Sequence, residues 1–132
     1  MEWSEEVTPV PQIGRSPGAS EDQIRASAES LGLEFPGFYA EVLRECNGFT
    51  TDKGLLLYSA EDLAERNETF EVRAYAPGFL AIGDDSGGRS ILIALDGSAT
   101  VYIVDQGSMD PDEFIEVSPD LLEWLHQGAE LP

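Results

Sequence analysis

The sequence has few basic residues: 7 Lys and Arg stand against 26 Asp and Glu, which gives a formal net charge of −19. A protein that binds DNA or RNA directly needs Lys and Arg to replace the counterions of the phosphates. An anionic membrane surface would repel this chain for the same reason. The charge balance therefore argues against nucleic-acid and membrane binding. It favours attraction to a basic protein partner, although the same acidity also keeps a protein soluble.

Cysteine and histidine each occur once, as Cys46 and His126. A single cysteine forms no internal disulfide, and Cys46 lies in an apolar helical pattern, so we interpret it as a small core residue. One His and one Cys far apart in the chain supply too few ligands for a zinc site. We expect His126 near a helix C-terminus, where a cation meets the negative end of the helix dipole.

Long apolar runs are also absent. No run reaches the length of a membrane span, and residues 1–6 are acidic and lack the apolar core of a signal peptide, so we expect a cytoplasmic protein. The 132 residues, 42% of them hydrophobic, suffice for one domain with a single core. Residues 1–19, with several Pro and Gly, predict an extended N-terminal arm, and the folded domain is predicted over residues 20–132.

Caps and apolar periodicity predict the first two helices. Ser20 and Gln23 have the form of a capping box, and Gly32 is placed to end the helix that they begin. A second helix begins near Pro36, a residue tolerated in a first turn, and stops at Asn47-Gly48.

Two further helices are shorter. Ser59 is expected to cap one of them, with Asn67 among its inward residues. Ser118-Pro119 is expected to cap the last helix, which Gly128 ends.

The remaining apolar segments predict strands over residues 55–58, 79–83, 90–95, 99–105 and 114–117. Tight turns at residues 84–88 and 96–98 join three of them, and Asp-Gly between apolar runs is a strong hairpin signal. The order α-α-β-α-β-β-β-β-α predicts an α+β single domain. Its sheet is mainly antiparallel, a meander of about four to six strands, with helices packed around it.

The turn between the second and third predicted strands contains Asp85-Ser86-Gly87-Gly88, which resembles the nucleophile turn of chymotrypsin-like proteases. That chemistry needs a His base beside the Ser, and the only His lies near the C-terminus with no catalytic sequence context. The turn is therefore interpreted as a hairpin, in which Gly83, Gly87 and Gly88 are structural.

Acidic residues gather at one end of the predicted meander. The hairpin turn and the exit of the strand at 99–105 lie at the same end of an antiparallel sheet. Six residues there are candidates for partner binding: Asp84, Asp85, Asp105, Asp110, Asp112 and Glu113. Solvated loop acids and a weak calcium or magnesium site are the alternatives. Four aromatic residues near loops or segment ends could anchor an interface: Trp3, Phe49, Tyr58 and Tyr75.

Several ordered blocks resemble the SUKH superfamily of Smi/Knr-like domains, over about residues 20–128. They are Ile24 with residues 29–36, then Phe38-Tyr39, Val42-Leu43 and Asn47-Gly48, residues 58–63 with Asn67, residues 80–88, Val101-Tyr102, and Trp124-Leu125. Two positions depart from the family pattern. Phe35 stands where Leu is commoner before Pro, and Arg89 stands where a polar or acidic residue is more usual.

The resemblance implies an α+β domain that binds protein and carries no cofactor. Bacterial members are commonly immunity proteins that neutralise toxin domains, often nucleases or deaminases, and a basic toxin would suit this acidic chain. Other members are regulatory interaction modules, so a regulatory or scaffold role is the first alternative. A metal-dependent enzyme that uses Asp84, Asp85 and Asp105 is the second.

Overall fold

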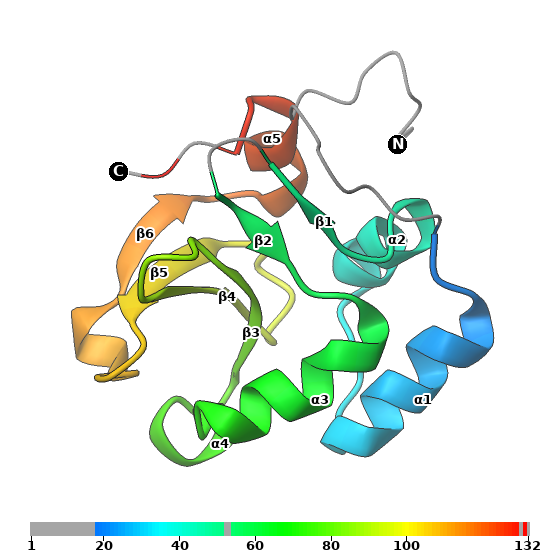
Figure 1. Cartoon of the computed structure of the whole chain (residues 1–132), viewed down its shortest axis with the longest axis horizontal. Coiled ribbons are helices and arrows are strands. Elements are labelled where there is room, and N and C mark those ends of the chain that lie inside the picture. The colour runs from blue at the N-terminus through cyan, green and yellow to red at the C-terminus, as the bar shows by residue number, and fades with distance from the viewer. Residues whose placement is uncertain (1–17, 52–53, 130, 132) are drawn as a thin grey trace.

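The centre of the molecule is an antiparallel meander, as Figure 1 shows. The computed structural model describes residues 18–51, 54–129 and 131. In chain order their elements are α1 (Glu21–Leu31), α2 (Gly37–Glu45), β1 (Phe49–Thr50), β2 (Leu56–Leu57), α3 (Ala60–Thr69), α4 (Val72–Tyr75), β3 (Phe79–Asp84), β4 (Arg89–Ala94), β5 (Val101–Asp105), the 3-10 helix η2 (Pro111–Glu113), β6 (Ile115–Ser118) and α5 (Leu121–His126). Each strand pairs antiparallel with the next, in the order β1-β2-β3-β4-β5-β6. The predicted single α+β domain is confirmed.

The caps predicted for α1 are present. The Ser20 hydroxyl accepts from the Gln23 amide at 3.1 Å, and the Gln23 side chain accepts from the Ser20 amide at 2.8 Å. Gly32 ends the helix in the left-handed conformation, with φ of 69°. Cys46 follows α2 and is buried, as its apolar pattern predicted.

The predicted cap of α3 is wrong in its chemistry. Ser59 occupies the N-cap position, but its hydroxyl makes no capping hydrogen bond. Asn47 takes that role, because its side-chain oxygen accepts from the amide of Ala60 at 2.6 Å and its side-chain nitrogen donates to Glu61 at 2.9 Å. The backbone of Gly48 then runs close to that of Ser59: a Cβ on Gly48 would lie 2.8 Å from the Ser59 nitrogen. The turn after α2 therefore also fixes the start of α3.

Three elements were not predicted from the sequence, and the cap of the last helix was assigned to the wrong residue. The short strand β1, the single turn α4 and η2 have no counterpart in the predicted order. Helix α5 is capped by Asp120, whose carboxylate accepts from the amide of Glu123 at 3.0 Å. The expected cap, Ser118, instead hydrogen-bonds the backbone of Asp120.

The sheet is covered on both faces. One face, towards α1, α2, α3 and α5, buries the larger core, which includes Leu80, Ile82, Ile91, Ile93, Val101 and Ile103 from the central strands. The opposite face carries Ala81, Leu92 and Val104 under Val72 and Ala76 from the α4 segment and Met109 from the loop after β5. The alternation along β3, β4 and β5 thus supplies both faces of the sheet.

Asn67 ties helix α3 to the sheet. Its amide nitrogen donates to the carbonyl of Ala81 at 3.0 Å, and its oxygen accepts from the Ala81 amide at 2.9 Å. Asn67 is buried, as predicted. The predicted N-terminal arm lies outside the described residues except for residues 18 and 19. No helix in the described ranges combines the length and apolar character that crossing a membrane requires.

Candidate partner-binding surface

The β3–β4 turn is held by the carboxylate of Asp85. One oxygen accepts from the amides of Gly87 at 2.8 Å and Arg89 at 3.0 Å, and the other accepts from the Arg89 guanidinium at 2.8 Å. Partial burial raises the pKa of this carboxyl, but the hydrogen bonds from Arg89 and Gly87 outweigh the burial, so the pKa lies below its usual range. Arg89, which departs from the family pattern, is therefore the ion-pair partner of Asp85.

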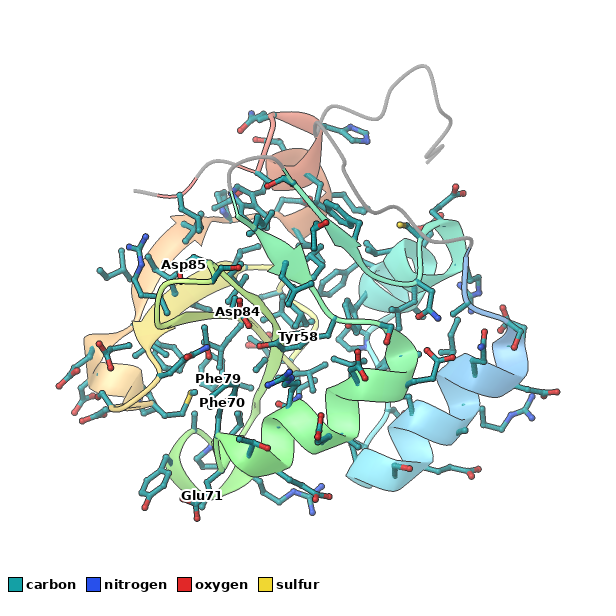
Figure 2. All side chains as sticks on the ribbon, viewed as in Figure 1. Tyr58, Phe70, Glu71, Phe79, Asp84 and Asp85 are labelled. Atoms are coloured by element: carbon teal, nitrogen blue, oxygen red, sulfur yellow. The ribbon has the colours of Figure 1, made fainter. Side chains whose placement is uncertain are left out.

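Asp84 is the last residue of β3, and its carboxylate has different partners from that of Asp85. One of its oxygens accepts from the Tyr58 hydroxyl at 2.8 Å, and the other accepts from the amide of Ser86 at 2.9 Å. Burial and the hydrogen bond to this carboxylate raise the pKa of Tyr58. The Arg66 guanidinium lies 5.9 Å from the centre of the Tyr58 ring. Figure 2 shows Asp84 beside Tyr58, with Asp85 further towards the turn.

Ser86 has a structural contact in place of a catalytic one. Its hydroxyl donates to the carbonyl of Gly54 at 2.7 Å, and its backbone has φ of 62°. Gly88, at φ of 103°, is the other left-handed position of the turn. Gly83 lies inside β3, where a Cβ would sit 2.2 Å from the carbonyl oxygen of Leu56. The φ of Gly87 lies outside the left-handed region, and a Cβ at this position would make only ordinary van der Waals contacts. The turn geometry therefore does not require glycine at position 87.

Asp105 shares the turn's end of the sheet. It lies directly opposite Arg89 across the β4–β5 ladder, and the amide of Gln106 donates to the carbonyl of Gly88 at 2.9 Å. Its carboxylate is exposed and accepts from the amide of Gly107 at 2.8 Å. The structure thus brings Asp85, Arg89 and Asp105 together at the end where the sequence predicted an acidic group.

The other three predicted acids lie around η2, after the loop that leaves β5. Asp110 accepts from the amide of Asp112 at 3.0 Å, and Asp112 and Glu113 are exposed. No group of three or more His, Cys, Asp or Glu residues in the described part of the chain is arranged to hold a metal ion. The hypothesis of a metal-dependent enzyme therefore has no ligand set among the described residues.

The negative charge of the surface is largely unbalanced. The described arginines are few and each already has a partner, so most of the described carboxylates have no cation beside them. Arg25 pairs with Asp22 at 3.0 Å and Arg44 with Glu21 at 2.6 Å, while Arg89 pairs with Asp85 at 2.8 Å. Arg73 donates to the Leu31 carbonyl, and Arg66 lies over the Tyr58 ring. The remaining carboxylates give the surface an excess of negative charge that a basic partner can meet.

Sequence reasoning missed a pocket of about 600 Å³ between the end of α1, the α3–α4 segment and the start of β3. Its walls are mainly apolar and include Leu31, Val72, Phe79 and Leu80, with Arg73 beside them. The volume lies in the range of ligand pockets. The segments that build it are far apart in the sequence, and α4 was not predicted, so no local pattern pointed to it.

Sequence reasoning also missed an aromatic cluster on the second face of the sheet. The ring centres of Phe79 and Phe114 lie 4.9 Å apart, and Tyr102 lies 5.6 Å from Phe79 and 5.7 Å from Phe114. All three side chains are half-buried. Period-two alternation from Ala81 and Val104 would have found Phe79 and Tyr102.

The four aromatic anchors expected from the sequence behave differently. Phe49 and Tyr58 are buried, whereas Tyr75 is 57% exposed. Trp3 lies outside the described residues. Tyr75 is thus the one described member of the set with a ring open to a partner.

Comparison with models of known protein families gives a match over most of the chain. The family model described as SMI1 / KNR4 family (SUKH-1) matches residues 18–127, which include every helix and strand described above. A search of curated proteins found no match.

Proposed function

The chain belongs to the SMI1/KNR4 family (SUKH-1), and on that premise we propose that it is a non-enzymatic immunity protein that binds and neutralises a cognate toxin domain. SUKH proteins are often immunity proteins. The family match over residues 18–127 is the observation that carries the proposal. The expected place of action is the cytoplasm, where the substrates of nuclease and deaminase toxins lie.

The charge of the chain supports a basic partner. A nuclease or nucleic-acid deaminase presents Lys and Arg to the phosphates of its substrate, and an acidic protein can occupy the same cleft. The formal net charge of −19, with the described arginines already engaged, supplies the complementary field. The proposed contact acids are those at the turn end and the η2 loop: Asp84, Asp85, Asp105, Asp110, Asp112 and Glu113.

Four of these acids form two pairs that differ in their contacts. The carboxylates of Asp84 and Asp85 hold the hairpin, and Asp85 is already paired with Arg89. Asp112 and Glu113 are exposed on η2. In the proposal the first pair shapes the surface and the second pair meets the cations of the toxin, since free carboxylates cost less to redirect than paired ones.

The test is co-expression with the toxin domains encoded beside the gene. Protection of growth by this chain, together with a stable complex in a pull-down, is the expected result. A non-cognate toxin domain of similar net charge serves as the control and should remain toxic, because steering by charge alone gives encounter without a fitted interface. If no neighbouring toxin domain is bound or neutralised, the immunity role is wrong. Capture of a host protein in its place would favour the regulatory alternative.

A further inference from the structure

Strand β6 forms an open edge of the sheet. It pairs with β5 through Val101–Ser118, Tyr102–Glu116 and Ile103–Ile115, and none of the described residues forms a strand on its other side. In the described part of the chain, the backbone of residues 115–117 makes no hydrogen bond outside this ladder. An edge strand leaves a row of N–H and C=O groups facing outward, and such a row can pair with another chain.

The side chains of β6 alternate in chemistry. Ile115 is 53% exposed, although its cross-strand partner Ile103 is fully buried. Glu116 is exposed on the opposite face, across from Tyr102. A strand added beside β6 would therefore meet an uncovered apolar side chain on one face and a carboxylate on the other.

The face that carries Glu116 also suits a cation. Tyr102 lies opposite Glu116, and Phe114 contacts Tyr102 with ring centres 5.7 Å apart. An Arg or Lys next to Glu116 would meet a carboxylate and half-buried aromatic rings together. The exposed acids Asp112 and Glu113 of η2 immediately precede the strand and extend the negative charge along the edge.

From these observations we propose that β6 is a docking edge that accepts an extended segment of a basic partner as an additional antiparallel or parallel strand. The docked segment alternates basic residues, on the Glu116 face, with apolar residues, on the Ile115 face. A register shift between Val101 and Tyr102 leaves Val117 as an additional residue in β6, so the regular part of the ladder is short and lies over Ile115 and Glu116. The inference names the docking mode of the partner proposed above and rests on that proposal.

A second copy of the chain fits this edge poorly. Pairing of two β6 strands would bring two copies of Glu116 close to each other, together with Asp112 and Glu113 from each side. Like charges in opposite positions destabilise a strand pair, and the net charge of −19 repels the copies at longer range. A basic segment turns each of these repulsions into an attraction.

The probe is a short peptide of alternating lysine and valine, blocked at both ends and titrated into the isotope-labelled full chain. Two control peptides are used: one with lysines and valines grouped in separate blocks, and one with alternate backbone nitrogens methylated. Backbone amide NMR shifts are expected at residues 114–117. The methylated peptide should bind at least about tenfold more weakly, because it cannot form the ladder.

Glu116→Lys should lower the affinity for the alternating peptide by about tenfold. Glu29→Lys, on the exposed face of α1, should change this affinity by no more than about twofold. Equal binding of all three peptides, or shifts confined to other surfaces, would overturn the docking edge. If a neighbouring toxin domain is neutralised but its affinity is unchanged by Glu116→Lys, the edge is wrong and the immunity role stands. If the peptide docks on β6 but no toxin is neutralised, the immunity role is wrong and the edge stands.

Discussion

Replacement of Asp85 tests whether the β3–β4 turn is held by one carboxylate. Asp85→Asn retains an oxygen that can accept from the amides of Gly87 and Arg89, but it places a neutral amide against the Arg89 guanidinium. Asp85→Ala removes all three hydrogen bonds. The two variants therefore separate the charged contact from the turn contacts.

The magnitude follows from burial and from the number of contacts. The Asp85 side chain is 15% exposed, and that of Arg89 is 37% exposed, so water screens the ion pair in part. The loss of one charge-assisted hydrogen bond in Asp85→Asn should lower the free energy of unfolding by about 1–2 kcal/mol. Asp85→Ala should lower it by about 3 kcal/mol, because two backbone amides also lose their acceptor.

Urea denaturation followed by circular dichroism measures both variants. The midpoint should move by roughly 0.5–1 M for Asp85→Asn and further for Asp85→Ala. Asp96→Ala is the matched control, since Asp96 accepts from the amide of Ser98 at 2.9 Å in the neighbouring β4–β5 turn but is exposed and pairs with none of the described arginines. Its midpoint should move less.

The pH dependence gives a second readout. The pKa of Asp85 is lower in the folded state than in the unfolded state. Its contribution to the stability of the fold is therefore complete above the unfolded pKa of about 3.9 and is lost as pH falls through the folded pKa. The stability gap between wild type and Asp85→Ala should be constant from neutral pH to about pH 5 and should shrink below about pH 4. A gap no larger than that of Asp96→Ala at neutral pH would refute the reasoning.

Three further predictions concern residues that hold β3 against β2, α3 and Tyr58. Gly83→Ala should lower the free energy of unfolding by about 1–3 kcal/mol in urea titrations, because the new Cβ would lie 2.2 Å from the Leu56 carbonyl oxygen. Unchanged stability would contradict this and show that β2 can shift without cost. Asn67→Ala should cost about 3 kcal/mol by the same measurement, because it leaves both backbone groups of the buried Ala81 without partners; a loss below about 1 kcal/mol would contradict this. Burial and a carboxylate raise the pKa of Tyr58, so Tyr58→Phe should remove one late-ionising phenol from the absorbance titration of the native chain; an unchanged late phase would contradict the assignment.

The sequence predicted the elements whose signals are local. The capping box at Ser20, the left-handed end at Gly32 and the Asp-Gly hairpin signal each depend on residues close together in the chain. Strand β1 has two residues and α4 has one turn, so neither is long enough to show a period. Their conformations depend on tertiary contacts, such as the burial of Phe49 and Val72.

The candidate surface was predicted in part for the same reason. Antiparallel order alone places Asp105 at the hairpin's end of the sheet. The different roles of Asp84 and Asp85 depend on their contacts with Tyr58 and Arg89. Tyr58 lies just after β2, 26 residues before Asp84 in the sequence. The capping of α3 by Asn47, from 13 residues away, escaped prediction because the nearer Ser59 satisfied the local rule.

The most direct test of the central claim is calorimetric titration of the purified chain with the toxin domain encoded beside its gene, at low and at physiological salt. An immunity protein that uses its negative surface should bind as a one-to-one complex, and its affinity should fall as salt screens the charges. Absence of binding at both salt concentrations would contradict the immunity role. Tight binding that does not change with salt would contradict the role of the acidic surface.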